Sequence, residues 1–160
     1  MILSLNFLRR KLMATVAQTI EQFNTEYPNQ VDDALKVTWL RKCEQMLINE
    51  IYIQHEHDLE DESKLKLSVS GSTLVITRAG TFADHISNFD MDTELLVPEP
   101  YDDLYLHYLA QRVAYNTNDK TRYNTAATMY NNALLTYQQY FNRTYKAITP
   151  SKKLFDHNNL

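Results

Sequence analysis

The sequence contains few of the residues that tight turns and disulfide frameworks require. It has only two glycines, four prolines and one cysteine among 160 residues. Because tight turns depend on glycine and proline, their scarcity favours long helices over an all-β architecture of many short strands. The single thiol, Cys43, cannot form a disulfide framework or a zinc site within the chain. We interpret it as a small apolar core residue, which is consistent with an intracellular place of synthesis.

Long apolar runs and an excess of basic residues are also missing. No stretch approaches the ~20 apolar residues of a membrane-spanning helix, so no membrane partner is expected. The net charge is −4, which argues against a general nucleic-acid-binding protein because phosphate binding requires a basic excess or a basic face. An apolar content of 44% in 160 residues predicts one globular domain with its own core.

Apolar residues recur at helical spacing through most of the chain. The pattern predicts a first helix over residues 14–27 and a long second helix over residues 32–54. The lone tryptophan, Trp39, is predicted to fix the second helix in the core, with a partner surface as the alternative. Two tyrosine-rich segments between residues 100 and 145 predict an antiparallel helix pair that is joined near residues 116–119.

Alternation of apolar and polar residues predicts strands in one region only. The alternating apolar residues are Leu65, Leu67, Val69, Leu74 and Ile76. Ser70-Gly71-Ser72 supplies a turn, so we predict a β-hairpin at about residues 63–78 that leans on the helices or joins strands of neighbouring subunits. Residues 78–93 are predicted to form an ordered loop. The predicted fold class is therefore mainly α, a small bundle of about four helices with an inserted β-hairpin.

The predicted organisation has three parts. Residues 1–13 form an N-terminal extension, residues 14–147 form the helical domain that contains the hairpin, and residues 148–160 form a C-terminal tail. The pair Asp102 and Asp103 lies where the third long helix begins. We interpret this pair as helix capping and not as acid/base chemistry, because no nucleophile or convergent histidine accompanies it.

One run combines histidines with acidic residues, which are residue types that bind metal ions. It contains His55 and His57 together with Glu56, Asp58, Glu60, Asp61 and Glu62. The run lacks the four-residue histidine spacing that places two ligands on one helix face, and the sequence identifies no further ligand. We interpret it as a solvated acidic loop or helix end. We therefore predict no metal, no cofactor and no catalytic residue, and a protein that is not an enzyme.

Several short runs share a pattern with one known family. They are Thr38-Trp39-Leu40 with Glu44, then Glu94-Leu95-Leu96-Val97-Pro98-Glu99-Pro100-Tyr101-Asp102-Asp103-Leu104-Tyr105, then Tyr123-Asn124, Met129-Tyr130-Asn131, and Asn142-Arg143-Thr144-Tyr145. In these runs the chain resembles head–tail connector proteins, also called adaptor or head completion proteins, of tailed bacteriophages and prophages. The resemblance covers roughly residues 14–145, and the run from Leu96 to Tyr105 is its most specific part.

The resemblance implies a structural virion protein at the head–tail interface, made in the cytoplasm of a host bacterium. It implies a homo-oligomer, a dodecameric ring that binds the portal protein and extends the DNA channel toward a stopper or tail protein. DNA would pass through the channel without specific binding, which suits an acidic chain because like charges repel. The family's C-terminal segment engages the portal, which assigns portal binding to Phe141, Arg143, Tyr145, Lys152, Lys153 and Phe155.

The residues alone leave a second function open. A small helical protein-binding module, such as a regulator or an assembly chaperone, would bind one partner through the tyrosine stripe of the last helix pair.

Overall fold

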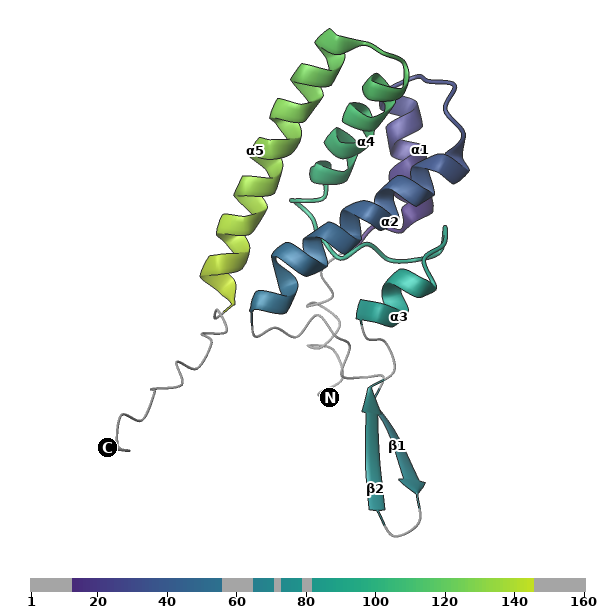
Figure 1. Ribbon diagram of the computed structural model, residues 1–160, viewed down its shortest axis with the longest axis vertical. Helices are drawn as coiled ribbons and strands as arrows, with labels where there is room; N and C mark the ends of the chain where they lie inside the picture. Colours follow the sequence, from purple (N-terminus) through teal and green to yellow (C-terminus); the bar gives the residue numbers. More distant parts are fainter. Residues whose placement is uncertain (1–12, 56–64, 71–72, 79–81, 146–160) are drawn as a thin grey trace, which may run out of the picture.

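Helices dominate the computed structural model, which describes residues 13–55, 65–70, 73–78 and 82–145 (Figure 1). The α-helices of these residues are α1 (Val16–Glu26), α2 (Asp33–Glu50), α3 (Phe82–Ser87), α4 (Asp103–Asn116) and α5 (Lys120–Thr144). A short 3₁₀-helix, η2 (Tyr52–Gln54), follows α2 directly. Two strands, β1 (Leu65–Ser70) and β2 (Thr73–Arg78), precede α3.

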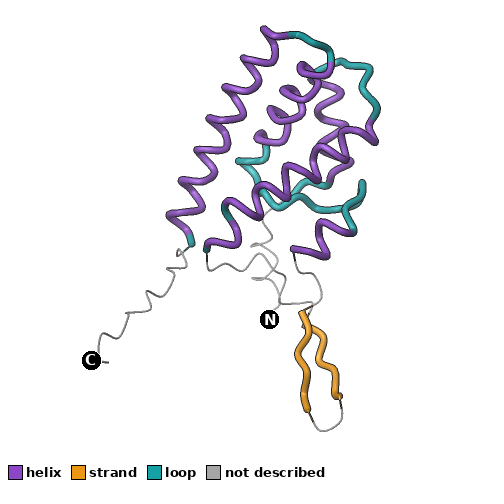
Figure 2. Tube along the Cα trace, in the orientation of Figure 1, coloured by secondary structure: helices purple, strands orange, loops and turns teal. Residues whose placement is uncertain are grey.

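The helices α1, α2, α4 and α5 lie together in one body (Figure 2). One hydrophobic core contains buried residues from all four of them. α4 and α5 lie side by side and antiparallel, joined through residues 117–119, as the tyrosine pattern predicted. α2 runs obliquely across the body, and its Trp39 is buried in the core as predicted. Burying a large apolar side chain stabilises a fold by about 1.5–3 kcal/mol relative to leaving it exposed. The most completely buried side chains include Ile20, Phe23, Leu40, Leu47, Leu104, Tyr105, Leu109, Tyr137 and Phe141.

Polar residues define where the long helices begin. At α1, the Thr15 hydroxyl accepts the Gln18 N–H at 3.2 Å while the Gln18 side chain accepts the Thr15 N–H at 3.0 Å, a reciprocal capping box. The side chains of Asp32 and Asp119 accept backbone N–H groups in the first turns of α2 and α5. Asp102 lies at the start of α4 and makes no side-chain capping hydrogen bond, but Asp103 lies in the first turn, where the predicted interaction of this acidic pair with the helix dipole is possible by position.

A buried lysine fixes the connection between α1 and α2. The Lys36 ammonium donates to the Asn24 side chain at 2.7 Å, to the Val31 carbonyl at 2.8 Å and to the Asp33 carboxylate at 2.8 Å. Hydrogen bonds from Lys36 and Asn24 lower the pKa of Asp33 below its ordinary value. All three ammonium donors are therefore used, which is the condition for burying a charged group without a large penalty.

The predicted fold class is corrected by the structure. Five α-helices occur among the described residues where about four were predicted, and the helical body contains no strand or sheet. β1 and β2 pair antiparallel with each other alone, from Leu65 opposite Arg78 to Ser70 opposite Thr73, and stand apart from the helices (Figure 1). A hairpin inserted in the bundle is therefore wrong. Alternation of residue types indicates which strands can pair, but it does not identify a surface on which the pair must pack.

The segment predicted as an ordered loop contains the helix α3. This helix has only six residues, which is too short for a helical period to be recognised and too short for independent stability. Its stability comes from tertiary contacts, including the hydrogen bond between its His85 and Glu44 of α2.

Two of the predicted parts of the chain cannot be compared with the structure. The N-terminal extension (1–13) and the C-terminal tail (148–160) lie outside the described residues except for Met13. They stay predictions. Within the part of the chain that is described, no helix combines the length and the apolar character needed to cross a membrane.

Candidate interaction surface

The outward side of α5 carries no charged side chain over most of its length. No Asp, Glu, Lys or Arg occurs from Tyr123 to Asn142, although charged residues make up 22% of the chain. The exposed residues in this stretch, which we call the α5 outer face, are Asn124, Thr125, Thr128, Met129, Asn131, Asn132, Leu135, Thr136, Gln139 and Asn142. Depletion of charge, more than bulk hydrophobicity, distinguishes the centre of a protein interface from other surface. The α5 outer face has this property.

Threonine hydroxyls on the α5 outer face are bonded to the helix itself. The hydroxyl of Thr125 donates to the Thr121 carbonyl at 3.2 Å, and those of Thr128 and Thr136 donate to the carbonyls four residues earlier at 2.9 Å. Because the hydroxyl hydrogen is already bonded within the helix, a partner protein that covers such a threonine leaves no donor unpaired. The free-energy cost of removing water from this surface is therefore lower. The surface also exposes two large apolar side chains, Leu135 at 53% and Met129 at 44%.

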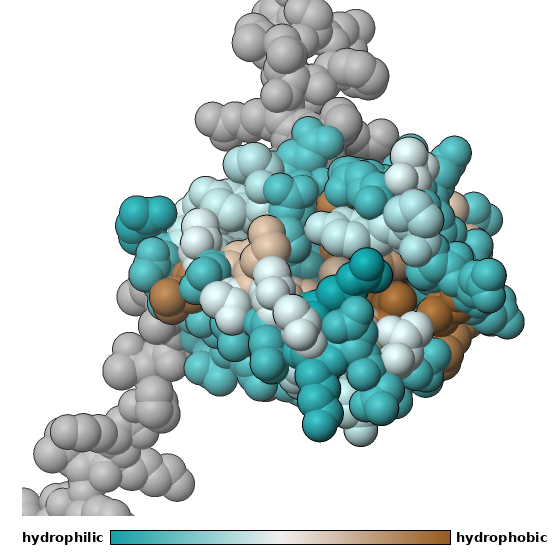
Figure 3. Space-filling view, turned by 90° about the horizontal axis from the view of Figure 1, so that it is seen from above, coloured by the Kyte–Doolittle hydropathy of each residue, from teal (hydrophilic) through white to brown (hydrophobic). Residues whose placement is uncertain are grey.

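A shallow groove of about 330 Å³ runs along one edge of the α5 outer face. Its lining residues are Pro100, Tyr101, Asp103, His107, Met129, Asn132, Ala133 and Thr136, which come from the start of α4 and the middle of α5. Viewed from above, the molecule shows hydrophobic residues only as small separate areas within a hydrophilic surface (Figure 3). The groove is therefore an edge feature of a mixed surface and not an enclosed ligand cavity.

An aromatic cluster on the opposite side of α5 fixes the helix to the body. The hydroxyls of Tyr52 and Tyr137 are hydrogen-bonded at 2.9 Å, and the rings of Tyr101 and Tyr140 stack at 4.6 Å. Burial raises the pKa of both Tyr52 and Tyr137, so both hydroxyls stay protonated. One of them donates the hydrogen bond and the other accepts it. These contacts fix the C-terminal half of α5, around Tyr137 and Tyr140, against the body of the protein.

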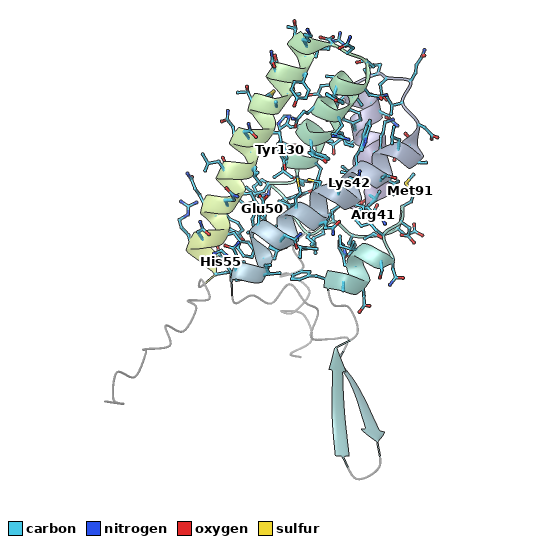
Figure 4. The ribbon with its side chains drawn as sticks, in the orientation of Figure 1. Arg41, Lys42, Glu50, His55, Met91 and Tyr130 are labelled. Carbon is cyan, nitrogen blue, oxygen red and sulfur yellow. The ribbon has the colours of Figure 1, made fainter. Side chains whose placement is uncertain are left out.

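Tyr130 continues the same buried side of α5 toward α2. It lies on the side of α5 that faces α4 (Figure 4), where its ring packs against Tyr108 at 5.3 Å, and its hydroxyl lies beside the Cys43 thiol of α2. Burial raises the pKa of Cys43 well above its ordinary value, so this sulfur is a neutral thiol and not a thiolate nucleophile. The predicted role of Cys43 as a core residue is confirmed by its complete burial.

A buried carboxylate connects four segments of the fold. Glu44 of α2 is 0% exposed, and its Oε2 atom accepts the Leu96 N–H at 3.1 Å and lies 2.8 Å from the His85 Nε2 atom. Its Oε1 atom accepts the hydroxyl of Tyr105, and that hydroxyl in turn accepts the Val97 N–H at 3.0 Å. Burial and the nearby Glu44 carboxylate raise the pKa of Tyr105, which keeps the phenol protonated as a donor.

This arrangement of Glu44, His85 and Tyr105 contains residue types that enzymes use, but its geometry is that of a scaffold. The Glu44 side chain has no solvent exposure, and it does not line the groove beside α5. Its oxygens are occupied by protein donors, which leaves no position for a reacting atom. The network fixes the buried segment that contains Leu96 and Val97, which belongs to the run that carries the resemblance to connector proteins.

The residues predicted to bind the portal divide into three groups. Phe141 is 1% exposed and contacts the rings of Tyr52, Tyr137 and Tyr145, so it belongs to the core. Arg143 is exposed on the last turn of α5, and Tyr145 is half-buried against Phe141. Lys152, Lys153 and Phe155 lie outside the described residues. Portal binding by this segment stays a prediction, to which Phe141 can contribute only by holding the end of α5 in place.

The histidine-rich run is only partly described. The Nδ1 atom of His55 lies 2.8 Å from the Ile51 carbonyl oxygen, and its ring packs edge-on against Phe141. Residues 56–62 lie outside the described residues. Among the described residues, no group of three or more histidines, cysteines or acids is arranged to hold a metal ion. That the chain binds no metal stays a prediction.

No family model, curated protein or solved structure was found to match this chain. The resemblance to connector proteins therefore depends on the motif residues themselves.

Sequence reasoning missed the α5 outer face, although a signal for it was present. The tyrosine stripe drew attention to the side of α5 that proves to be buried, through Tyr130, Tyr137 and Phe141. The usable signal was the absence of charge between Tyr123 and Asn142 on a helix with one buried side. Lys36 and Glu44 were also missed as buried groups. Their signal was a charged residue inside an apolar stripe, beside Val37 and Cys43 respectively.

Proposed function

We propose that this chain is a head–tail connector protein of a tailed bacteriophage or prophage. In this role it is a structural virion protein that forms a ring beneath the portal, extends the DNA channel and links the head to the tail. The observation that carries the proposal is the charge-free α5 outer face, which nothing in the described residues of the same chain covers. The motif run from Leu96 to Tyr105 gives the proposal its family, because it resembles the corresponding run of connector proteins.

The size of the α5 outer face favours weak association of single subunits that becomes stable in a closed ring or on a portal. The α5 outer face spans the 19 residues 124–142 and is therefore about 28 Å long, so a strip about 10 Å wide along it covers about 280 Å². A standard stable interface buries about 800 Å² on each partner. One α5 outer face is therefore too small for a tight dimer by itself. Repeated contacts around a ring, or added contacts with a portal, supply the remaining area.

The charge of the chain supports the proposed path of DNA. A net charge of −4 gives no general attraction for the phosphate backbone, so DNA can move through the ring without binding specifically. The proposed partners are therefore proteins: other copies of the chain, the portal, and a stopper or tail protein. The proposed location is the head–tail interface of the virion, after synthesis in the cytoplasm of the host bacterium.

A small helical protein-binding module is the second candidate. The observation that favours it is the groove beside α5, where Tyr101 and Met129 offer apolar contacts for a segment of a single partner. A regulator or assembly chaperone of this kind would form a complex of one chain with one partner and would not form rings. Particle size by electron microscopy and by light scattering separates the two candidates.

Replacing Leu135 with glutamate is expected to abolish ring formation while the domain stays folded. Leu135 lies at the middle of the α5 outer face and is 53% exposed, so a charge there affects association more than folding. The measurement is electron microscopy of the protein mixed with portal rings, together with a thermal unfolding curve of the isolated variant. Leu35→Glu, which changes another exposed leucine on α2, is the matched control and should leave ring formation unchanged.

Electron microscopy of the wild-type protein mixed with portal rings tests the proposed function itself. Rings on the portal support it, and their loss in Leu135→Glu alone assigns the contact to α5. A wild-type chain that stays monomeric at every concentration and does not bind portal rings contradicts the proposed function.

Deletion of residues 151–160 is expected to weaken attachment to the portal at least tenfold without unfolding the domain. This expectation follows from the resemblance, which assigns portal binding to the C-terminal segment, including Lys152, Lys153 and Phe155. Binding of the truncated and full-length chains to immobilised portal rings measures the effect. Equal affinity of the two chains would remove this segment from the interface.

A further inference from the structure

A tightly bonded turn presents an exposed methionine on the side of the molecule away from α5. In this turn, Asp90–Thr93, the Asp90 Oδ1 atom accepts the Asp92 N–H and the Thr93 hydroxyl, both at 3.0 Å. The Thr93 hydroxyl oxygen also accepts the Asp90 N–H at 2.9 Å. These bonds leave the backbone of the turn few alternative conformations. We call residues Asp90–Thr93 the Met91 turn.

The Met91 turn is also bonded to the first residues of α1. The Met91 carbonyl accepts the Ala17 N–H at 2.9 Å, and the Thr93 carbonyl accepts the Val16 N–H at 2.9 Å. Two N–H groups that have no partner within the helix are satisfied in this way. The side chain of Met91 is nevertheless 39% exposed. An exposed apolar side chain on a rigid support loses little entropy on binding, which favours its use as a contact residue.

The two sides differ in charge: the Met91 turn carries exposed acids, whereas the α5 outer face carries no charge and has basic residues only beyond its two ends. No Lys or Arg occurs between Arg78 and Arg112, and the exposed acids of this stretch include Asp90, Asp92 and Glu94. α5 has no acidic residue at all, and its charged residues are Lys120, Arg122 and Arg143. The basic residues Arg41 and Lys42 of α2 are exposed on the same side of the molecule as Met91 (Figure 4). The acidic excess is therefore limited to Asp90, Asp92 and Glu94 and does not extend over the whole side.

The chemistry of the two surfaces is complementary. Met91 can pack on the apolar atoms of Leu135 and on the outward methyl groups of Thr128 and Thr136, whose hydroxyls are bonded to the helix. The amides of Asn131, Asn132 and Gln139 supply donors for the carboxylates beside Met91. Two copies of the Met91 turn would repel each other because each carries Asp90 and Asp92. Contact between unlike surfaces is therefore favoured over contact between like ones.

We infer that the Met91 turn of one subunit docks on the α5 outer face of the next, close to Leu135. The two surfaces lie at opposite edges of the molecule (Figure 4). A contact between different surfaces of identical chains repeats from subunit to subunit and produces a ring when the rotation closes. This inference rests on the proposed function, because it specifies the subunit contact of the proposed ring.

Cysteine cross-linking tests the contact directly. Cys43 is buried, and Cys43→Ala removes it as a source of other disulfides. In that background, Met91→Cys and Leu135→Cys are made in separate proteins, which are mixed, assembled with portal rings and oxidised. We expect disulfide dimers in the mixture at least tenfold above the level in either protein alone. A protein that carries both substitutions should give a ladder of covalent oligomers on a non-reducing gel.

Gln30→Cys is the control position, because Gln30 is exposed in the connection between α1 and α2 and belongs to neither surface. A mixture of Gln30→Cys with Leu135→Cys should show only background cross-linking. Electron microscopy of each variant, unoxidised, verifies that rings still form.

The outcomes separate the inference from the proposed function. Rings without cross-linking above the Gln30 control overturn the inference and leave the proposed function standing. Strong cross-linking of Leu135→Cys with itself also overturns the inference, since it shows a symmetric contact between two α5 helices. An absence of rings in the wild-type protein with its portal contradicts the proposed function as well.

Discussion

Replacement of Glu44 by alanine is expected to lower the free energy of unfolding by about 3–5 kcal/mol. The truncation removes the acceptor of the Leu96 N–H and of the Tyr105 hydroxyl, and it leaves His85 without its carboxylate partner. Donors that lose their partner in a buried site lose hydrogen-bond energy that water cannot restore. Because domains of this size are stable by only about 5–15 kcal/mol, the variant should unfold at a much lower denaturant concentration.

Two other variants isolate the cause of this loss. Glu50→Ala removes a carboxylate from an exposed position on the same helix and should change stability by less than about 0.5 kcal/mol. Glu44→Gln keeps one acceptor oxygen and should fall between the wild type and Glu44→Ala. Denaturation curves that show a loss below about 1 kcal/mol for Glu44→Ala would contradict the scaffold role of the network.

The second large effect is expected for Phe141→Ala, with a loss of about 3–5 kcal/mol in the free energy of unfolding. The ring is 1% exposed and lies among Tyr52, Tyr137 and Tyr145, so its removal leaves a cavity at the end of α5. Arg143→Ala, two residues later and exposed, should keep wild-type stability.

Portal binding distinguishes the roles of these two residues. If Arg143 contacts the portal, Arg143→Ala weakens binding of a fully folded domain, whereas Phe141→Ala weakens binding only in proportion to the unfolded fraction. Near wild-type stability of Phe141→Ala in a calorimetric scan would show that this ring does not support the core.

The long helices could be predicted because their buried residues recur locally. The core contains Trp39 together with Tyr105, Tyr108, Tyr130 and Tyr137 of α4 and α5, and their helical spacing is visible within short windows of sequence. α3 could not be predicted, because its six residues depend on the contact of His85 with Glu44, which lies far away in the chain. The hairpin prediction failed for a related reason, since alternation contains no information about what a strand pair packs on.

The Glu44 network and the α5 outer face were harder to predict than the helical core. The partners of Glu44 include Leu96 and Tyr105, and no local pattern connects residues at such separations. The α5 outer face became recognisable only when the structure showed which side of the helix is exposed. The missing charge was readable from the start, but an absence of charge on a helix is equally typical of a buried helix. The exposure of the side chains on the outer side of α5 shows that the missing charge marks a surface and not a buried helix.

The backbone of residues 95–97 has a further consequence for how this fold is built. Three successive N–H groups are satisfied by three unrelated parts of the chain: Leu95 by the Ala14 carbonyl, Leu96 by Glu44 and Val97 by the Tyr105 hydroxyl. A β-strand would need a neighbouring strand to satisfy the same groups along a straight line. Side-chain acceptors have no such directional requirement. The chain can therefore cross the protein interior with bends at Leu96 and Val97, and continue into α4, without belonging to a sheet.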